Sequence, residues 1–425
     1  MRAMKEYTVD DVFGVVREIP LNYVPRESVD QNLIESLSRI KHIVIHGGSK
    51  QGKTCLRKHC LDEDDYIVVQ CSNRWSIADI NTNILKRAGF EITQSSERAS
   101  SGRQKILAKF SATLAGLGLG ADAEKEESQS QKTVTAPLTL DPDDVNDLIG
   151  ALDSIGFKKF IVLEDFHYLS PEAQGDFAIE LKALHEGSGF CVIIVGVWLE
   201  ENRLIVYNGD LTGRVIPIDA DEWKRDELRE VITSGARLLN IHFEDEFIEE
   251  LLDNCFDSVA IVQECCRRAC RRAEVYRTQE ALVEVRYAGS VQGLIREVVN
   301  EQRGRYQAFI TNFSDGFQDT RLEMYRWLLW PVLTSDSKQL EDGLTYADIR
   351  KALQNKHPDG KSLNPGNITQ ALQSAASLQV EKSVKPIILD YDATTRRLSV
   401  VDRGFLIWLA NQGTDELLEM AGLDA

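Results

Sequence analysis

Residues 47–54 read Gly47-Gly48-Ser49-Lys50-Gln51-Gly52-Lys53-Thr54 and match the pattern G-x-x-x-x-G-K-[ST] at every fixed position. The β-branched run at 42–46 predicts a strand before it, and residues 55–60 can continue as a helix. In that context the glycines let the backbone wrap a phosphate chain, and the helix start aims unpaired N–H groups at it. The stretch therefore predicts a nucleotide-binding loop.

The same pattern assigns roles within the loop. Lys53 is expected to span the β- and γ-phosphates, and the Thr54 hydroxyl to ligate Mg²⁺. The predicted cofactors are ATP and Mg²⁺. The predicted cofactor contacts are Gly47, Gly48, Ser49, Lys50, Gln51, Gly52, Lys53, Thr54 and Cys55.

Composition sets the class of protein. The chain has 425 residues, of which 43% are hydrophobic and 27% charged, as expected for a soluble protein of two or three domains. The N-terminus lacks the apolar segment of a signal peptide, and the longest apolar run, 190–199, is too short to span a membrane. The eight cysteines include no C-x-x-C pair. We therefore expect a cytoplasmic protein with reduced thiols and no membrane partner.

Charge is spread unevenly along the chain. The net charge is −18, but residues 321–413 hold 12 lysines and arginines against 10 acids, a local charge of +2 that leaves −20 for the remainder. This argues against nucleic acid coating the whole surface. Any DNA contact is expected to be local and to come from the C-terminal third.

Alternating strand and helix patterns predict the fold class. Apolar strand-like runs at 66–71, 160–163, 190–195 and 214–218 are separated by helical patterns, which favours an α/β fold with a parallel sheet. The predicted domains are an N-terminal approach segment (1–40), a P-loop core (41–220) with a partly ordered insertion at about 92–145, a helical lid (221–312) and a winged-helix domain (313–425).

Two acids follow one of the predicted strands. The run Phe160–Leu163 is followed directly by Glu164 and Asp165, the arrangement of a Walker B strand. One carboxylate would orient the metal and its waters, and the other would polarise the attacking water. Their order is the reverse of the usual Asp-Glu, so the division of labour stays open. The alternative is a solvated strand end carrying two surface acids.

The next strand and the loop after it are where residues that contact the γ-phosphate are expected. After the strand at 190–195 come Gly196-Val197-Trp198, which offer no polar sensor side chain. The polar loop 208–214 ends in Arg214, interpreted as a finger that reaches the γ-phosphate of a neighbouring subunit. A structural salt bridge is the alternative, and Arg203 is a second candidate. The basic helix at 267–272 is interpreted as a solvated or partner-facing side.

Residues 23 to about 275 resemble an AAA+ ATPase of the origin-recognition/initiator type, close to the STAND signalling ATPases and to the ATPase regulators of bacterial transposition. The P-loop, the Glu164-Asp165 pair and the Arg214 loop carry the resemblance, which implies ATP-dependent oligomerisation into a homo-oligomer. The departures are the missing polar sensor, the inverted acids, and a lid helix that starts Asp257-Ser258-Val259 instead of a Gly-Asp-x-Arg-like sequence.

The C-terminal third has the pattern of a winged helix. Helices are predicted at 322–333, 344–353 and 364–378, followed by a hairpin at 386–401 and a closing helix at 402–411, with Asn364 as N-cap and Pro365 at the first helical position. In such modules the third helix enters the major groove. The predicted DNA contacts are Gln370, Gln373, Lys382, Lys385, Arg396 and Arg397. The third helix carries no arginine or lysine, so a protein-docking or autoinhibitory role is the alternative.

Together these patterns predict an ATP-binding and hydrolysing AAA+ switch that assembles in a nucleotide-dependent way and contacts double-stranded DNA. The alternative is a STAND-like signalling or anti-phage defence ATPase that turns over ATP slowly and whose winged helix contacts a protein effector.

Overall fold

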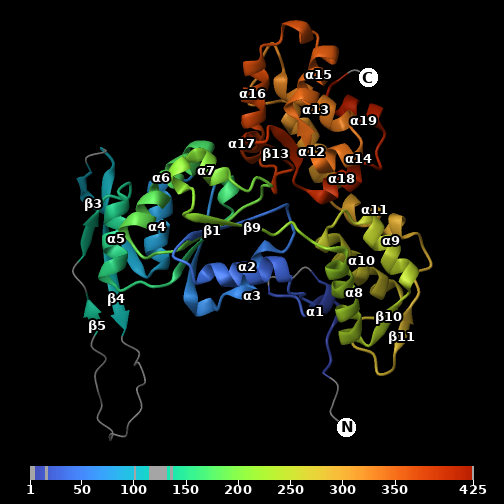
Figure 1. Ribbon diagram of the computed structural model, residues 1–425, viewed down its shortest axis with the longest axis horizontal. Coiled ribbons are helices and arrows are strands. Elements are labelled where there is room, and N and C mark those ends of the chain that lie inside the picture. The colour runs from blue at the N-terminus through green and yellow to red at the C-terminus, as the bar shows by residue number, and fades with distance from the viewer. Residues whose placement is uncertain (1–4, 15–17, 100–101, 114–131, 135–136, 424–425) are drawn as a thin grey trace, which may run out of the picture.

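The computed structural model describes residues 5–14, 18–99, 102–113, 132–134 and 137–423. In Figure 1 these residues form an α/β core, a helical domain beside it and a C-terminal domain above both. None of the described helices is long and apolar enough to cross a membrane.

Five parallel strands form the centre of the α/β core. Their order is β2-β7-β8-β1-β9, which confirms the predicted parallel sheet and places the strand before the P-loop between two neighbours. All carboxyl ends of parallel strands lie at one sheet edge, so the P-loop and Glu164 leave from the same edge. The bounds are β1 (His42–His46), β2 (Tyr66–Gln70), β7 (Phe160–Glu164), β8 (Val192–Val195) and β9 (Val215–Asp219).

Alternation along the strands divides the core into two apolar layers. Ile43 and Ile45 of β1 pack with one helix layer, whereas Val44 packs with the other, as expected where successive side chains point to opposite faces. The first layer holds α2 (Glu27–Leu37) and α3 (Lys53–Cys60). The second holds α4 (Ile77–Arg87), α5 (Val145–Ser154) and α6 (Pro171–Gly187).

The predicted insertion contains an antiparallel sheet. Strand β4 pairs with β3, β5 and β6, and the β3–β5 end extends away from the core in Figure 1. The expectation of a partly ordered segment is therefore replaced, in the described part, by regular strands. The glycine cluster at 116–120 and the acidic run at 124–127 lie outside the described residues. The strands are β3 (Phe90–Arg98), β4 (Gln104–Thr113), β5 (Lys132–Val134) and β6 (Leu138–Leu140).

The helical domain is not purely helical. Two short strands, β10 (Ile241–Phe243) and β11 (Val283–Val285), pair in parallel beside its helices, which corrects the all-helical prediction. The N-terminal helix α1 (Val9–Phe13) packs here, where the Phe13 ring meets Phe243 edge to face. The main helices are α8 (Arg225–Leu239), α9 (Asp245–Asn254), α10 (Val259–Arg272) and α11 (Val291–Asn300).

The C-terminal domain combines helices with a three-stranded sheet of order β12-β14-β13. The predicted N-cap is confirmed, because the Asn364 side chain accepts from the Gly366 amide at 2.9 Å. The predicted third helix is wrong in length: it breaks near Ser374 into α16 and α17. The elements are α13 (Met324–Thr334), α14 (Ser337–Asp342), β12 (Leu344–Thr345), α15 (Tyr346–Lys356), α16 (Pro365–Gln373), α17 (Ala375–Glu381), β13 (Leu389–Asp392), β14 (Arg397–Val400), α18 (Arg403–Leu409) and α19 (Thr414–Met420).

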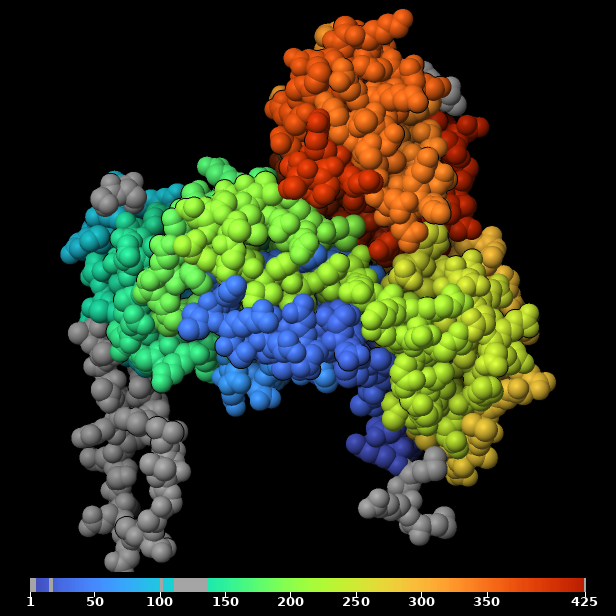
Figure 2. All heavy atoms as spheres, in the orientation of Figure 1, coloured from blue at the N-terminus to red at the C-terminus, as the bar shows by residue number. Residues whose placement is uncertain are grey.

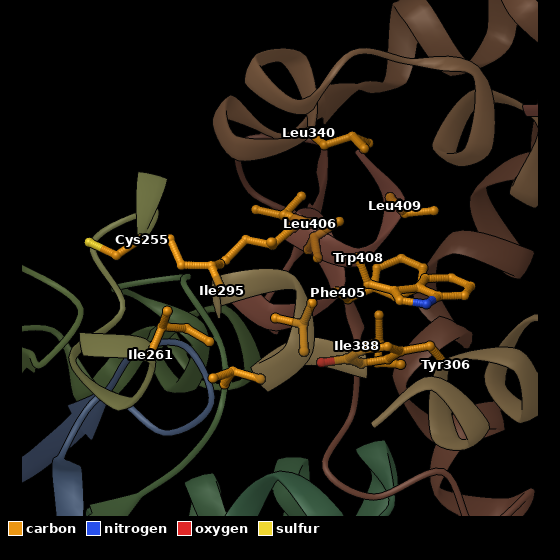
Figure 3. Close-up of a cluster of buried hydrophobic side chains, with 14 of the residues drawn as sticks. Cys255, Ile261, Ile295, Tyr306, Leu340, Ile388, Phe405, Leu406, Trp408 and Leu409 are labelled. Atoms are coloured by element: carbon orange, nitrogen blue, oxygen red, sulfur yellow. The ribbon is translucent and has the colours of Figure 1, made fainter. Parts of the chain in front are cut away.

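One apolar cluster joins the helical and C-terminal domains. Figure 3 shows Ile261 and Ile295 of the helical domain in the same cluster as Leu406 and Trp408 of α18. Tyr306 of α12 (Arg303–Ser314) packs against the ring of Trp408 in this cluster. Burial of this much apolar surface favours movement of the two domains as a unit. The α/β core has its own separate clusters.

Candidate nucleotide-binding site

Backbone conformation shapes the P-loop. Gly47 has φ +139°, and a Cβ there would lie 2.9 Å from the Asp221 amide nitrogen, so only glycine fits. Gly52 has φ +86° and caps the N-terminus of α3, whose first residue is Lys53. The chain therefore leaves β1, curls once and begins a helix, as the sequence predicts.

Lys53 lies inside this curl. Its Nζ donates to the carbonyl oxygens of Gly47 at 3.0 Å and Gly48 at 2.5 Å. Burial lowers the pKa of Lys53 to about 8. The Lys53 ammonium group is thus held beside the loop by two neutral carbonyl oxygens. A negatively charged phosphate oxygen could take their place as its hydrogen-bond acceptor.

The start of α3 offers donors for an anion. Among the described residues, no acceptor outside the helix is found for the amides of Lys53, Thr54 and Cys55. Thr54 is exposed on this first turn. Unpaired N–H groups at a helix N-terminus together with the helix dipole form an anion-binding site.

The two acids after β7 occupy different environments. Glu164 is buried, and Arg57 of α3 donates its Nε to Glu164 Oε1 at 2.9 Å while its guanidinium lies over the Tyr66 ring. Burial raises the pKa of Glu164, an effect that Arg57 opposes. Asp165 has the left-handed φ of 59° and accepts from Gln70 Nε2 at 2.9 Å. Glu164 therefore faces the core and Asp165 faces outward.

Strand β8, which neighbours β7, is followed by Gly196, Val197 and Trp198. The carbonyl of Trp198 accepts from the Gly47 amide at 2.9 Å, and the Trp198 side chain is fully buried. A Cβ at Gly196 would overlap the Trp198 ring, since it would lie 1.6 Å from a ring carbon. At the expected sensor position, Trp198 therefore supports the P-loop through the hydrogen bond of its carbonyl and through the packing of its buried ring.

The two finger candidates lie in different places. Arg214 precedes β9 at the amino edge of the sheet, opposite the P-loop, and its Nη2 donates to Glu186 at 2.8 Å. This placement excludes contact with its own P-loop, so a finger role could only be in trans. Arg203 is wrong as a finger candidate, because it forms a buried ion pair with Asp390 of the C-terminal domain.

The basic side of α10 is neutralised by acids. Arg267 and Arg268 both pair with Glu264, and Arg271 pairs with Asp10 of α1. These arginines stabilise the packing of the helical domain and are not directed at the P-loop by any contact among the described residues.

Sequence reasoning missed three groups that contact the P-loop. The Gly48 amide donates to Asp221 Oδ1 at 2.8 Å, and the Ser49 amide donates to the Val401 carbonyl at 2.7 Å. The Gln51 side chain donates to the Asp257 carbonyl at 3.1 Å. Asp221 follows β9, Asp257 precedes α10 and Val401 precedes α18, and no local pattern marks any of them as a partner of the loop.

The predicted DNA-contact residues differ in whether they contact other parts of the chain. Gln370 and Gln373 are exposed on α16, and Lys382 is half-buried at the end of α17. Arg397 donates to the carbonyls of Asp342 and Gly343. Two further cations lie over aromatic rings: Lys385 over Tyr168 of the α/β core at 4.3 Å, and Arg396 over Tyr346 at 4.1 Å.

Three solved structures are similar to this chain to different degrees. A Walker-type ATPase, PABY2304 of Pyrococcus abyssi, is similar with a TM-score of 0.50 and 13% identity over 94% of this chain and 99% of that chain. Cdc6p from Pyrobaculum aerophilum has a TM-score of 0.40 and 11% identity over 97% of both chains. The Orc1 protein of Aeropyrum pernix, solved in complex with DNA, has a TM-score of 0.45 and 11% identity over 98% of both chains.

No family model matches the chain, and no curated protein sequence matches it. At this identity the first likeness shows the fold alone. It confirms the predicted fold class, an α/β fold built on a parallel sheet, which this chain shares with that Walker-type ATPase.

Proposed function

We propose that this chain binds ATP with Mg²⁺ and hydrolyses the bound nucleotide. The observation that carries the proposal is the position of Lys53 at the start of α3, on the same sheet edge as Glu164 and Asp165. A buried ammonium, a helix N-terminus and two carboxylates at one edge are the elements that phosphoryl transfer to water requires.

The residues present fit the proposed cofactors. The first amides of α3 would bind phosphate oxygens, with Lys53 moving from the Gly47 and Gly48 carbonyls to the phosphate chain. Thr54 and a carboxylate would hold the metal, which neutralises phosphate charge when bound. No group of three or more His, Cys, Asp and Glu side chains in the described residues could hold a metal alone, so phosphate oxygens would complete the site.

The structure favours different roles for the two acids. In our proposal Glu164, which is tied to Arg57, would orient the metal, and Asp165, which accepts from Gln70, would polarise the attacking water. Under this assignment Asp165→Asn lowers the rate of hydrolysis by about a hundredfold while ATP affinity stays within about threefold. Glu172→Gln, on the exposed start of α6, is the control. A loss of affinity as large as the loss of rate would contradict the assignment.

We further propose nucleotide-dependent assembly with other copies of the chain, in which Arg214 acts in trans, and contact of the C-terminal domain with double-stranded DNA through exposed Gln370 and Gln373. The contact of Lys385 with Tyr168 of the core favours the second candidate, a slow ATPase switch whose C-terminal domain faces a protein effector.

The central test is ATP binding and hydrolysis by the full chain. Lys53→Ala is expected to weaken ATP binding more than a hundredfold, because it removes the only P-loop lysine directed into the curl. Lys58→Ala on the same helix, whose Nζ pairs with Glu18 at 3.1 Å, is the matched control and should bind within about twofold. Unchanged affinity in Lys53→Ala would sink the assignment. Hydrolysis stimulated by double-stranded DNA would favour the first candidate; DNA-indifferent, slow hydrolysis would favour the second.

A further inference from the structure

The C-terminal domain contacts the phosphate-binding loop directly. The Val401 carbonyl accepts from the Ser49 amide at 2.7 Å. Two residues on, Arg403 Nη2 donates to Asp221 Oδ2 at 2.9 Å, and the other oxygen of Asp221 accepts from the Gly48 amide. We call residues 401–403 together with Asp221 the clasp. It places a carbonyl and a carboxylate on consecutive amides of the P-loop.

The clasp is supported by a buried interface between the α/β core and the C-terminal domain. Arg203 Nη1 donates to both carboxylate oxygens of Asp390 at 3.0 Å, and these side chains are only 12% and 4% exposed. Behind this ion pair, four apolar side chains from the two domains form a separate buried cluster: Val197, Val380, Ile387 and Val401. Figure 2 shows the C-terminal domain seated on the core, with its red segments against the green surface.

The predicted wing, which is the hairpin of β13 and β14, belongs to the same interface. The Thr394 hydroxyl, in the turn between β13 and β14, donates to Glu200 of the core at 3.0 Å. Lys385 lies over the ring of Tyr168, three residues after Asp165. The hairpin and Lys385, both predicted to face a partner, thus contact the chain's own core.

The clasp would compete with phosphate for the amides of the P-loop. Amides at a glycine-rich loop bind anions, and in this structure two of them are satisfied by Asp221 and Val401. The carboxylate of Asp221 would also repel a phosphate chain entering the loop, since the two negative groups would share one set of donors. Arg403 holds that carboxylate in place.

We propose that the clasp is an autoinhibitory contact: it must leave the Gly48 and Ser49 amides for a nucleoside triphosphate to occupy the loop fully, and its release frees the wing. This inference rests on the proposed function. Two ligands that favour the same released state strengthen each other's binding, so nucleotide and wing partner are coupled reciprocally.

Loosening the clasp should tighten nucleotide binding. Arg403→Ala removes the anchor of Asp221, and we expect the affinity for ATP to rise about tenfold, within the usual range of such coupling. Arg321→Ala is the matched control, because its partner Asp359 lies in the same domain and its removal crosses no interface. Asp390→Asn, which weakens the Arg203 pair without changing size, is a second loosening variant and should shift affinity in the same direction.

Locking the interface should have the opposite effect. In the double variant Glu200→Cys with Thr394→Cys, oxidation would join two positions whose side chains are within hydrogen-bond distance. We expect the oxidised protein to bind ATP at least tenfold more weakly than the same protein after reduction. Variants that carry only one of the two substitutions should bind ATP equally well before and after oxidation.

These experiments separate the two proposals. Equal ATP affinity in the native chain, the loosened variants and the locked variant would overturn the clasp while leaving the proposed function standing. Failure of every variant to bind ATP would overturn the proposed function, and the clasp with it. If the cysteine pair does not cross-link, judged by intact mass, equal ATP affinity in the native chain and the two loosened variants would by itself overturn the clasp.

Discussion

The two halves of the P-loop make contacts of different kinds. The second half, which continues from Gly52 into α3, contacts the α/β core: Lys53 returns to the loop itself and Arg57 of α3 pairs with Glu164. The first half, from Gly47 to Gln51, is joined to the core by the Gly47 amide and the Trp198 carbonyl, and it also contacts segments outside the parallel sheet: Asp221, the helical domain and the C-terminal domain.

The residues proposed to act on the nucleotide therefore differ from those proposed to restrict its access to the loop. Side chains that would act on phosphate and metal are fixed by one strand, one helix and their immediate neighbours. Groups that restrict access come from residues remote in sequence, held by a domain interface that can open as a unit. A nucleotide can bias such an interface only if it binds the open and closed arrangements differently. The first half of the loop is where that difference would arise.

The largest effect is expected from the pair within the core. Arg57→Ala leaves the carboxylate of Glu164 buried without its cation, and we expect the free energy of unfolding to fall by about 3–5 kcal/mol. Urea titration measures it. The double variant Arg57→Ala with Glu164→Gln removes the charge as well and should recover part of the loss. If the double variant lost as much as the single, the ion pair would not be what stabilises this half of the loop.

A second carboxylate is buried in the core, and no cation among the described residues lies at hydrogen-bond distance from it. Glu180 of α6 accepts from Asn81 Nδ2 at 2.6 Å, and burial raises its pKa from 4.5 to about 7. Since the folded-state pKa is raised, the contribution of Glu180 to stability is fully present below pH 4.5 and is lost as the pH rises through about 7.

Glu180→Gln should therefore flatten the pH dependence of stability in this window. At pH 8 we expect the variant to be more stable than the native chain by about 2 kcal/mol, since the amide keeps an acceptor for Asn81 and carries no charge. Unfolding titrations at pH 5 and pH 8 measure the difference. A variant equally destabilised at both values would contradict the role of Glu180 ionisation. Glu172→Gln, exposed at the start of the same helix, serves as control.

Sequence predicts the local part of this molecule well, for physical reasons. The spacing of Gly47, Gly52 and Lys53 requires one strand–loop–helix geometry, and apolar runs ending in acids require buried parallel strands. The parallel sheet and the Asn364 cap follow from such local patterns. The break of the third C-terminal helix near Ser374 does not, because apolar positions on both sides continue one helical period.

Contacts between domains were beyond sequence reasoning. The acceptor at Ser49 is the backbone carbonyl of Val401, and a carbonyl is present at every residue, so no side-chain pattern can mark it. Arg203 was named as the second finger candidate, whereas its partner Asp390 lies in a β-strand of another domain. Domain docking brings these groups together, and it depends on the whole apolar interface.

The smallest effect concerns the contact between the first half of the loop and the helical domain. Gln51 Nε2 donates to the Asp257 carbonyl at 3.1 Å, and Trp223 Nε1 donates to the Gln51 carbonyl at 3.3 Å, so Asp257 and Trp223 hold the loop without occupying its Gly48 and Ser49 amides. Gln51→Ala removes only the side-chain hydrogen bond, which contributes about 1 kcal/mol. We expect ATP affinity to fall about fivefold, opposite in sign to the rise expected for Arg403→Ala. Calorimetric titration of both variants with ATP measures the two signs. A rise in affinity in Gln51→Ala would mean that both neighbouring domains restrain the loop, and would remove the distinction between a supporting and an inhibiting contact.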